Sequence, residues 1–492
     1  MNAQTMRERA VARCRERHIL IPTFAQMRDP ASLDPAVVAA LREVDMQAVD
    51  PLNLFRITWR NNLETGTFGE VNALELPAQL TGVRARIIGL IGAYFPTGAH
   101  KVGAAFGCLV PRLVNGEFDP TTHLAVWPST GNYCRGGAFD SALLGCRPVA
   151  ILPEEMSRER FEWLERIGAE IIATPGCESN VKEIFDACWK IREERPETVV
   201  FNQFDEFGNY LWHYGVTGPA AESAFRRHAR PDDRLAGWVG ATGSAGTLAA
   251  GDYLKEQFRN VTITAAEPLQ CPTLLMNGYG GHRIEGIGDK HVPWIHNVRN
   301  TDAVAAIDDE ATMRLLRLFN EPAGHEVLRR YGVAVGVIER LGLLGISSIC
   351  NLLAAIKVAN YYALDEHDVL IMSLTDSVEL YRTRLDELRR ERGEYTETQA
   401  TADLERYLLG AGTDHFKELL FTDRKAIHNL KYFTWVEQQG KTVDELDALW
   451  SRSFWRDLVT QLPELDEQIA QFNRDTGVLD HIRRRQTADR SL

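Results

Sequence analysis

The sequence predicts a doubly wound α/β fold with helical extensions at both ends. From about residue 85, short apolar runs alternate with helix-like stretches, and this alternation is typical of a parallel sheet covered by helices. Several runs are apolar on both faces, as expected for strands buried inside such a sheet. The expected strands lie in the segments ARIIGLIGAY, HLAVWPS, PVAILPE, AEIIATP, TVVFNQF, RLAGWVG, VTITAAEP and VLIMSLTD.

The two ends of the chain differ from this central pattern. Residues 1–71 have no clear strand pattern, and after about residue 385 the sequence becomes charged and helical. We therefore expect an N-terminal extension over 1–71, a catalytic domain over 72–385 and a helical C-terminal extension over 386–492. The last of these contains Trp435, Trp450 and Trp455, which need a surface to bury against, either on the catalytic body or on a second subunit.

Composition excludes several classes of partner. The 492 residues are 45% apolar and 25% charged, which is ordinary for a globular protein. The net charge of -13 and the absence of a basic stripe argue against nucleic acid. No apolar run is long enough to span a bilayer, and the N-terminus lacks the apolar core of a secretory signal. The eight cysteines are scattered without a CxxC pair, which argues against a zinc site and predicts a reducing, cytoplasmic setting.

Lys101 lies in the segment YFPTGAHKVGAA, just after an apolar run. Its neighbours include Gly98, Ala99, Gly103 and Ala104, and such small residues let a backbone or a ligand come close. Lys101 is therefore either a surface charge or an amine held for chemistry.

The segment GATGSAGT, residues 240–247, follows an apolar strand and opens a helix. Small residues there expose successive backbone N–H groups, which cradle an anion at the positive end of the helix. Two ligands fit the pattern: a lone phosphate, or a dinucleotide held by Gly240, Gly243 and Gly246 with Glu267 as ribose ligand. A tight turn without a ligand is the structural alternative.

Two further strand ends have polar residues. PSTGNYCRGG, residues 128–137, places hydroxyls and an asparagine at a helix start, which suits a carboxylate. SLTDSVELY places Asp376 and Ser377 just past another strand. Helix capping is the alternative for both. His282 and His291 have no metal-ligand spacing, so no metal site is expected.

These features are consistent with one cofactor. An amine that can form a Schiff base, together with a phosphate cradle, indicates pyridoxal phosphate. A dinucleotide enzyme would leave Lys101 and Ser377 unexplained.

Eight segments in order resemble the fold type II pyridoxal-phosphate enzymes, and within them the cysteine synthase and cystathionine β-synthase branch, over about residues 72–385. They are FPTGAHKVG, STGN, NQFDEFGNYLWHYGVTGP, GATGSAGTLAAGDYLK, EPLQCPTLL, RIEGIGDKHVP, GISSICNLLAAIKVA and TDSVELY. The resemblance implies two doubly wound subdomains of the tryptophan synthase β-like fold, of which the smaller, mobile one spans about 102–205.

The resemblance also implies roles for individual residues. Lys101 would bind the cofactor covalently and later remove the α-proton of the substrate. The substrate carboxylate would be bound by Ser129, Thr130, Gly131 and Gln203. The cofactor would be bound by Lys101, Asn132, Gly243, Ser244, Ala245, Gly246, Thr247 and Ser377.

Within this set, Ser377 would face the pyridine nitrogen, and a neutral hydroxyl there favours loss of a β-substituent over transamination. Asp376 is the rival for that position. Two departures from the family pattern stand out. Ala245 occupies a position that is usually glycine, and Tyr133 with Cys134 replaces a small Thr-Gly pair, which is expected to crowd the substrate pocket.

We therefore expect a pyridoxal-phosphate enzyme, a lyase or transferase, that acts at the β-carbon of a small amino acid through an aminoacrylate intermediate. Cysteine-synthase-like β-replacement or β-elimination is the leading prediction. The alternatives are a serine, threonine or diaminopropionate ammonia-lyase, a nicotinamide-dependent oxidoreductase, and a catalytically silent partner subunit. A homodimer is expected.

Overall fold

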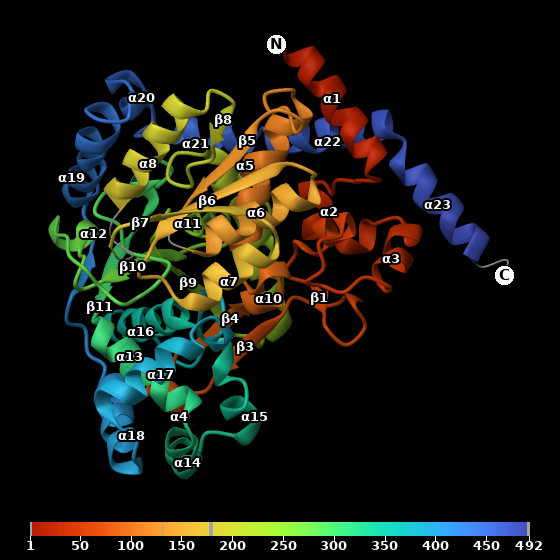
Figure 1. Ribbon diagram of the computed structural model, residues 1–492. Coiled ribbons are helices and arrows are strands. Elements are labelled where there is room, and N and C mark those ends of the chain that lie inside the picture. Colours follow the sequence, from red (N-terminus) through yellow and green to blue (C-terminus); the bar gives the residue numbers. More distant parts are fainter. Residues whose placement is uncertain (1, 130, 177–180, 490–492) are drawn as a thin grey trace.

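Two mostly parallel sheets form the centre of the protein, as Figure 1 shows for the computed structural model, which describes residues 2–129, 131–176 and 181–489. The larger sheet has seven strands in the order β13-β11-β10-β9-β12-β4-β3. Its edge strands β3 and β13 are antiparallel to their neighbours, and the other pairs are parallel. The strands are β3 (Ala73–Leu76), β4 (Arg86–Ile91), β9 (Arg234–Ala241), β10 (Thr262–Pro268), β11 (Ala303–Ile307), β12 (Asp368–Leu374) and β13 (Phe416–Glu418).

The smaller sheet has four parallel strands in the order β7-β6-β5-β8. They are β5 (Leu124–Pro128), β6 (Arg147–Pro153), β7 (Glu170–Thr174) and β8 (Thr198–Val200). All eight predicted strands are therefore present, and the α/β prediction is confirmed. The sequence did not reveal β3, β11 and β13, nor the short hairpin of β1 (Asn61–Asn62) and β2 (Thr67–Phe68).

Helices cover both faces of each sheet, which explains why the strands are apolar on both sides. On the larger sheet, α10 and α11 pack on one face, and α13 and α16 cover the other. On the smaller sheet, α6 lies on one face, with α5 packed against α6, and α8 lies on the other face. These helices are α5 (Lys101–Val114), α6 (Asn132–Leu143), α8 (Val181–Glu194), α10 (Gly218–His228), α11 (Leu248–Gln257), α13 (Asp309–Asn320) and α16 (Ile346–Tyr361).

The remaining catalytic-body helices are short or lie at the sheet margins. They are α4 (Ala78–Thr81), α7 (Arg158–Arg166), α9 (Phe207–Trp212), α12 (Thr273–Met276), α14 (Pro322–Arg330), α15 (Val335–Ile338) and α17 (Arg382–Arg392). Among the described ranges, no helix combines the length and apolar character needed to cross a membrane.

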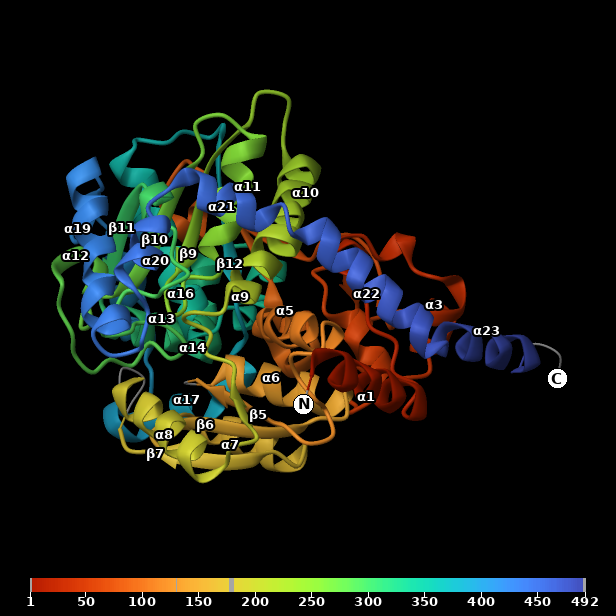
Figure 2. The same cartoon turned by 90° about the horizontal axis from the view of Figure 1, so that it is seen from above.

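The two terminal regions pack on each other and on the body (Figures 1 and 2). Helix α1 contacts α22, α23 contacts α3, and both α1 and α22 contact α5. Trp435 and Trp455 are buried against the catalytic body, so the prediction that these tryptophans need a surface is confirmed for them. The terminal helices are α1 (Ala3–Glu16), α2 (Phe24–Arg28), α3 (Pro35–Leu41), α18 (Glu397–Asp403), α19 (Phe421–Lys431), α20 (Val443–Ala448), α21 (Arg452–Val459), α22 (Leu462–Thr476) and α23 (Val478–Asp489).

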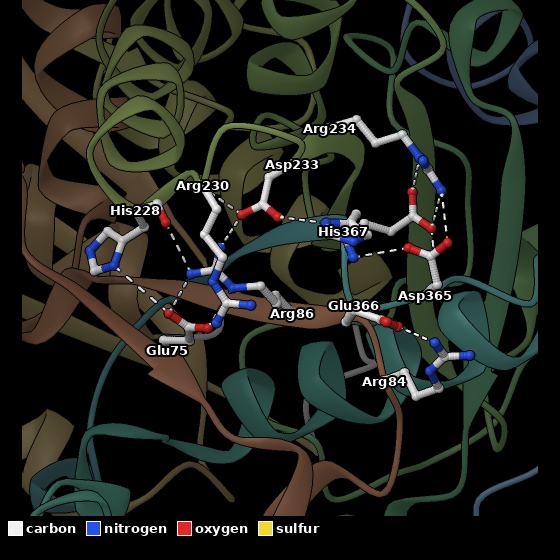
Figure 3. Close-up of polar contacts among 11 residues, drawn as sticks. Glu75, Arg84, Arg86, His228, Arg230, Asp233, Arg234, Asp365, Glu366 and His367 are labelled. Atoms are coloured by element: carbon white, nitrogen blue, oxygen red, sulfur yellow. Dashed lines mark hydrogen bonds and ion pairs between the residues drawn. The ribbon is translucent and has the colours of Figure 1, made fainter.

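A charged cluster closes the amino end of the larger sheet, as Figure 3 shows. Arg86, the first residue of β4, donates to both carboxylate oxygens of Glu75, at 2.7 and 2.8 Å, and also pairs with Asp233. Arg234, the first residue of β9, pairs with Asp365 at 3.3 Å. Because ligands in such folds bind at the carboxyl ends of strands, this cluster is a structural feature away from the candidate site.

Candidate active site

Lys101 is the first residue of α5, which begins after β4 and two short 3₁₀ turns. Its Nζ donates a hydrogen bond of 3.1 Å to the carbonyl oxygen of Gly286, and its side chain is half-buried. A Cβ on the neighbouring Gly103 would lie 2.1 Å from the indole of Trp212. The small size of Gly103 thus serves the packing of α5 against α9, while Lys101 remains at the edge of a cavity.

The segment from Gly243 to Thr247 forms the predicted turn between β9 and α11. Among the described residues, none of its backbone N–H groups donates to a backbone carbonyl. The turn therefore presents amide donors at the N-terminus of a ten-residue helix, where the helix dipole favours an anion. Ala245 has φ 62°, a left-handed conformation that explains why glycine is usual at this position.

Asn209 of α9 buttresses this turn. Its Nδ2 donates to the Oγ of Ser244 at 2.9 Å and to the carbonyl of Gln203 at 3.0 Å, while its buried Oδ1 has no partner. A Cβ on Gly246 would lie 2.1 Å from that Oδ1. The side chain of Asn209 therefore fills the space that a residue larger than glycine would need at position 246.

Two buried histidines lie beside Lys101. His100 is fully buried, and neither ring nitrogen has a hydrogen-bond partner in the described part of the chain. Burial and the charge of Lys101 lower the pKa of His100 to about 3. The ring centroid of His213 lies 5.3 Å from that of His100, and burial lowers its pKa as well. Both shifts favour the neutral form of the ring.

One cavity brings together the lysine, the turn and part of the predicted substrate site. Its lining includes a lysine, two histidines, two amides and several hydroxyls. The lining residues are His100, Lys101, Ala104, Gln203, Asn209, His213, Ala241, Gly243, Ser244, Ala245, Gly246, Thr247, Gly286, Ile287, Ser373 and Thr375. An amine, an amide-rich anion cradle and unpaired buried donors and acceptors fit the aldehyde and phosphate of pyridoxal phosphate.

The predicted carboxylate loop adjoins this cavity through Gln203. The Nε2 of Gln203 donates to the Oγ of Ser129 at 3.2 Å, and the N–H of Gly131 reaches the same oxygen at 3.3 Å. Neither Ser129 nor Gly131 lines the cavity. Thr130 was predicted to bind the same carboxylate, and it lies outside the described residues.

Tyr133 and Cys134 do not line the cavity, so the structure gives no crowding of the pocket by their side chains. Both are fully buried in the main core, where the Tyr133 ring meets that of Trp127 edge-on at 5.4 Å. Both residues belong to the first turn of α6.

Asn132 and Asp376 are joined by a buried hydrogen bond. The Nδ2 of Asn132 donates to a carboxylate oxygen of Asp376 at 2.6 Å, and the hydroxyl of Tyr381 donates to the same oxygen at 2.7 Å. Burial raises the pKa of Asp376, and the charge of Arg160 opposes that rise. Asp376 thus has protein partners of its own and does not line the cavity.

Ser377 is half-buried and is also absent from the cavity lining. Two other hydroxyls at the end of β12, Ser373 and Thr375, do line it. The structure therefore does not bring Ser377 to the other predicted cofactor residues, and it places two candidate hydroxyls there that sequence reasoning missed.

An ion-pair network crosses from the smaller-sheet region to the larger. Arg160 of α7, fully buried, pairs with Glu285 at 3.0 Å and donates to the hydroxyl of Tyr381 at 3.0 Å. Glu285 also pairs with Arg384 at 2.7 Å. A Cβ on Gly131 would lie 2.4 Å from Arg160 Nη1, so this network abuts the carboxylate loop.

Asp289 is a further buried titratable group that the sequence analysis did not single out. One of its carboxylate oxygens is buried without a partner, and burial raises its pKa to about 7 while the charge of Lys101 opposes that rise. It lies three residues after Gly286, the acceptor for Lys101. The signal in the sequence was an acidic residue directly after the Gly-Ile-Gly run of RIEGIGDK.

Glu267, the ribose ligand of the dinucleotide alternative, is engaged elsewhere. Its two carboxylate oxygens each accept a backbone N–H at 2.8 Å, from Leu274 and Leu275 of α12. The carboxylate therefore accepts hydrogen bonds from the free N–H groups at the start of α12, and a ribose would have to displace these hydrogen bonds.

Comparison with known proteins agrees with this cavity. Residues 93–341, half of the chain, match the model of a family described as pyridoxal-phosphate dependent enzyme. Cystathionine beta-synthase of Saccharomyces cerevisiae is 25% identical over 402 residues, which cover 80% of this chain and 75% of that protein. A probable cysteine synthase of Bacillus subtilis is 28% identical over 287 residues, covering 58% of this chain and 85% of that protein.

Solved structures share the fold. Cysteine synthase of Entamoeba histolytica superposes with a TM-score of 0.55 at 22% identity, covering 68% of this chain and 93% of that one. The O-acetylserine dependent cystathionine beta-synthase of Helicobacter pylori gives 0.53 at 20% identity, covering 64% and 95%. The family match overturns the nicotinamide alternative and confirms the predicted cofactor. The chain belongs to the family of pyridoxal-phosphate dependent enzymes and has their tryptophan synthase β-like fold.

Proposed function

We propose that this protein catalyses β-replacement or β-elimination on a small amino acid, with Lys101 as the catalytic lysine. The observation that carries the proposal is that Lys101, the anion cradle of residues 243–247 and Gln203 line one cavity. The relatives named cysteine synthase and cystathionine beta-synthase support the reaction class.

Different residues around the cavity would bind different parts of the cofactor. Residues 243–247 would hold the phosphate through backbone N–H groups, with Asn209 fixing the turn from behind. Lys101 would form the covalent link to the cofactor. Asn132 donates one amide hydrogen to Asp376, so its second hydrogen remains for the ring oxygen of the cofactor. A hydroxyl near the end of β12 would meet the ring nitrogen; the sequence suggested Ser377, whereas Ser373 and Thr375 are the hydroxyls that line the cavity.

Pyridoxal phosphate, when bound, supplies the electron sink that makes the α-proton of an amino acid acidic and its β-substituent a leaving group. Lys101 Nζ would then take the α-proton, and the carbonyl oxygen of Gly286 orients that nitrogen. Ser129, Thr130, Gly131 and Gln203 would hold the substrate carboxylate, which keeps the α-carbon facing Lys101. A neutral hydroxyl at the ring nitrogen favours departure of the β-substituent.

A substrate panel tests the proposal. O-acetylserine, O-phosphoserine, serine, threonine, diaminopropionate and cysteine would each be supplied with and without sulfide or a thiol. β-Replacement predicts a new amino acid carrying the nucleophile, whereas elimination predicts a keto acid and ammonia regardless of the nucleophile. Lys101→Ala is the control. If the wild-type protein holds its cofactor but turns over no substrate with a β-leaving group, the proposed reaction class is wrong.

Two further proposals concern the assembly of the protein and the motion of one subdomain. We propose that the protein is a homodimer, which light scattering of the purified protein tests directly. We also propose that residues of about 102–205 form a subdomain that moves relative to the rest. If they do, Arg160→Met, which removes the buried pair with Glu285, should increase amide exchange in that region.

A further inference from the structure

The C-terminal region outside the family match contacts a segment that leads directly to Lys101. This segment, residues 286–296, begins at the cavity, where Gly286 and Ile287 form part of the lining. Gly286 supplies the carbonyl oxygen that accepts from Lys101 Nζ at 3.1 Å. The segment then continues past the buried Asp289 to Trp294 and His296, which are also buried.

Two buried side chains of the C-terminal region bind the backbone of that segment. Lys431, the last residue of α19, donates through Nζ to the carbonyl oxygens of Trp294 at 2.8 Å and His296 at 2.7 Å. Trp435 donates through Nε1 to the carbonyl oxygen of Val292 at 2.8 Å. The carbonyl oxygens of three alternate residues, 292, 294 and 296, are therefore bound by two side chains one helical turn apart, at 431 and 435.

Burial of the Lys431 side chain is unfavourable, and the packing of α19 on the body does not by itself explain why a lysine lies there. Its side chain is 0% exposed, and within the described part of the chain no carboxylate forms an ion pair with it. Burial lowers its pKa well below the usual range. Burial without a counter-ion disfavours the charged form of the amine, and even a neutral amine loses its hydration there, so an apolar side chain would attach the helix to the body at a smaller cost in free energy. Lys431, unlike an apolar side chain, forms two directed hydrogen bonds to the segment.

The same turn packs an aromatic cluster around the segment. The Trp435 ring centroid lies 5.9 Å from that of His291 and 6.1 Å from that of Trp294. His291 also packs on Phe185 and Phe204 at 5.4 Å each. Packed aromatic contacts of this kind hold a backbone in one position, since interiors are close-packed and resist small displacements.

We propose that Lys431 and Trp435 are positioning residues that fix the segment 286–296, and thereby the Gly286 carbonyl and Asp289, against Lys101. The C-terminal region then helps to position the groups that face Lys101 in the active site. This inference rests on the proposed role of Lys101 in catalysis. Loss of an interaction that orients the catalytic amine from outside the cavity should lower the reaction rate more than it weakens substrate binding. A displacement of the amine by about 1 Å can lower the rate by up to about a hundredfold.

The variants Lys431→Met and Trp435→Phe test the proposal, since each removes the donor and keeps an apolar side chain of similar size. Lys431→Arg, which restores donors, is the rescue. Lys425→Met is the matched control, because Lys425 lies on the same helix and its Nζ contacts the ring of Trp450 at 4.8 Å instead of the segment. Far-ultraviolet circular dichroism and thermal melting identify variants that have lost their fold.

Amide hydrogen exchange is the first measurement, and it does not depend on any catalytic activity. We expect Lys431→Met and Trp435→Phe to speed exchange by about threefold or more both in the peptide containing Gly286 and in the peptide containing Lys101, and Lys425→Met to change neither. Faster exchange confined to residues after 420 in folded variants would overturn the proposal.

The second measurement is the pH titration of the visible absorption band of the bound cofactor, followed by kcat and KM on the best substrate. We expect both variants to shift the titration midpoint, and to lower kcat about tenfold with KM within about twofold, with Lys431→Arg in between. A wild-type midpoint in folded Lys431→Met and Trp435→Phe would contradict the proposal. A shifted midpoint with no turnover even in the wild type would uphold it and count against the proposed reaction instead.

Discussion

The Nζ of Lys101 lies 3.1 Å from the carbonyl oxygen of Gly286, although the two residues are 185 positions apart in the chain. This contact joins the start of α5 to the segment 286–296. That segment contains Asp289, and the C-terminal region binds it on the side away from the cavity. A carbonyl acceptor fixes the direction of an amine without neutralising it, which leaves the amine available for covalent chemistry.

The cradle prediction concerns Gly246. In Gly246→Ala the new Cβ would lie 2.1 Å from Asn209 Oδ1, so the turn or Asn209 must move. We expect the affinity of the apoprotein for pyridoxal phosphate to fall by roughly ten- to a hundredfold, because a hydrogen bond to a charged group contributes about 1.5–3 kcal/mol. Fluorescence titration measures this. Gly336→Ala is the control, since a Cβ there meets nothing within 4 Å. Equal affinities in the two variants would remove residues 243–247 from the phosphate site.

The backbone of Ala245 yields a stability prediction. At φ 62° an alanine costs roughly 1–2 kcal/mol relative to its favoured conformations, and glycine does not bear this cost. The greater freedom of glycine in the unfolded chain offsets about 0.4–1 kcal/mol of the gain. Ala245→Gly should therefore raise the free energy of unfolding by about 0.5–1 kcal/mol in urea denaturation. Ala249→Gly, inside α11, should lower it. A destabilised Ala245→Gly protein would show that the turn adopts another conformation.

The ring-nitrogen partner is decided among three hydroxyls near the end of β12. Ser373 and Thr375 line the cavity and Ser377 does not. We therefore expect Ser377→Ala to leave the visible spectrum of the bound cofactor unchanged, and Ser373→Ala or Thr375→Ala to shift it. A shift in Ser377→Ala alone would support the sequence-based assignment. Asp376→Asn is informative as well, because a shifted spectrum there together with unchanged spectra in Ser373→Ala, Thr375→Ala and Ser377→Ala would assign the nitrogen to the carboxylate.

Asp289 predicts a pH dependence of stability. Burial raises its pKa in the folded protein to about 7, whereas an unfolded aspartate titrates near 3.9. The folded state therefore holds the extra proton in between, and the contribution to stability is complete below about pH 4 and is lost as the pH rises through about 7. The melting temperature of wild type minus that of Asp289→Asn should fall between pH 5 and pH 8. A difference independent of pH would mean that Asp289 is ionised throughout.

The sequence predicted the catalytic body better than the contacts within it. The eight strands were predicted because buried parallel strands are long apolar runs, and β11 was missed because AVAAI is rich in alanine, which has low strand propensity. Lys101 and residues 243–247 were expected together because each follows the carboxyl end of a strand, and β4 and β9 belong to the same sheet. Gln203, which follows β8 of the smaller sheet, was assigned through the family resemblance.

Other residues could not be assigned from short motifs. His100, Asn209 and Asp289 gain their place from packing between distant segments, and each looks like an ordinary polar residue in the sequence. Tyr133 was expected in the pocket because it replaces a small residue, yet the first turn of α6 points its ring into the core. Helix rotation decides such cases, and a local pattern does not specify it. The anchoring of 286–296 by Lys431 likewise depends on how the C-terminal region docks.

Borohydride reduction of the purified holoprotein, followed by peptide mapping, tests the central claim most directly. Two lysines compete in this structure: Lys101 at the cavity, and Lys431, which is fully buried with a lowered pKa. The account predicts that the reduced cofactor is attached to the peptide containing Lys101 and that Lys101→Ala carries no label. Label on Lys431 or another lysine, or a Lys101→Ala protein that is still fixed to its cofactor, would contradict it.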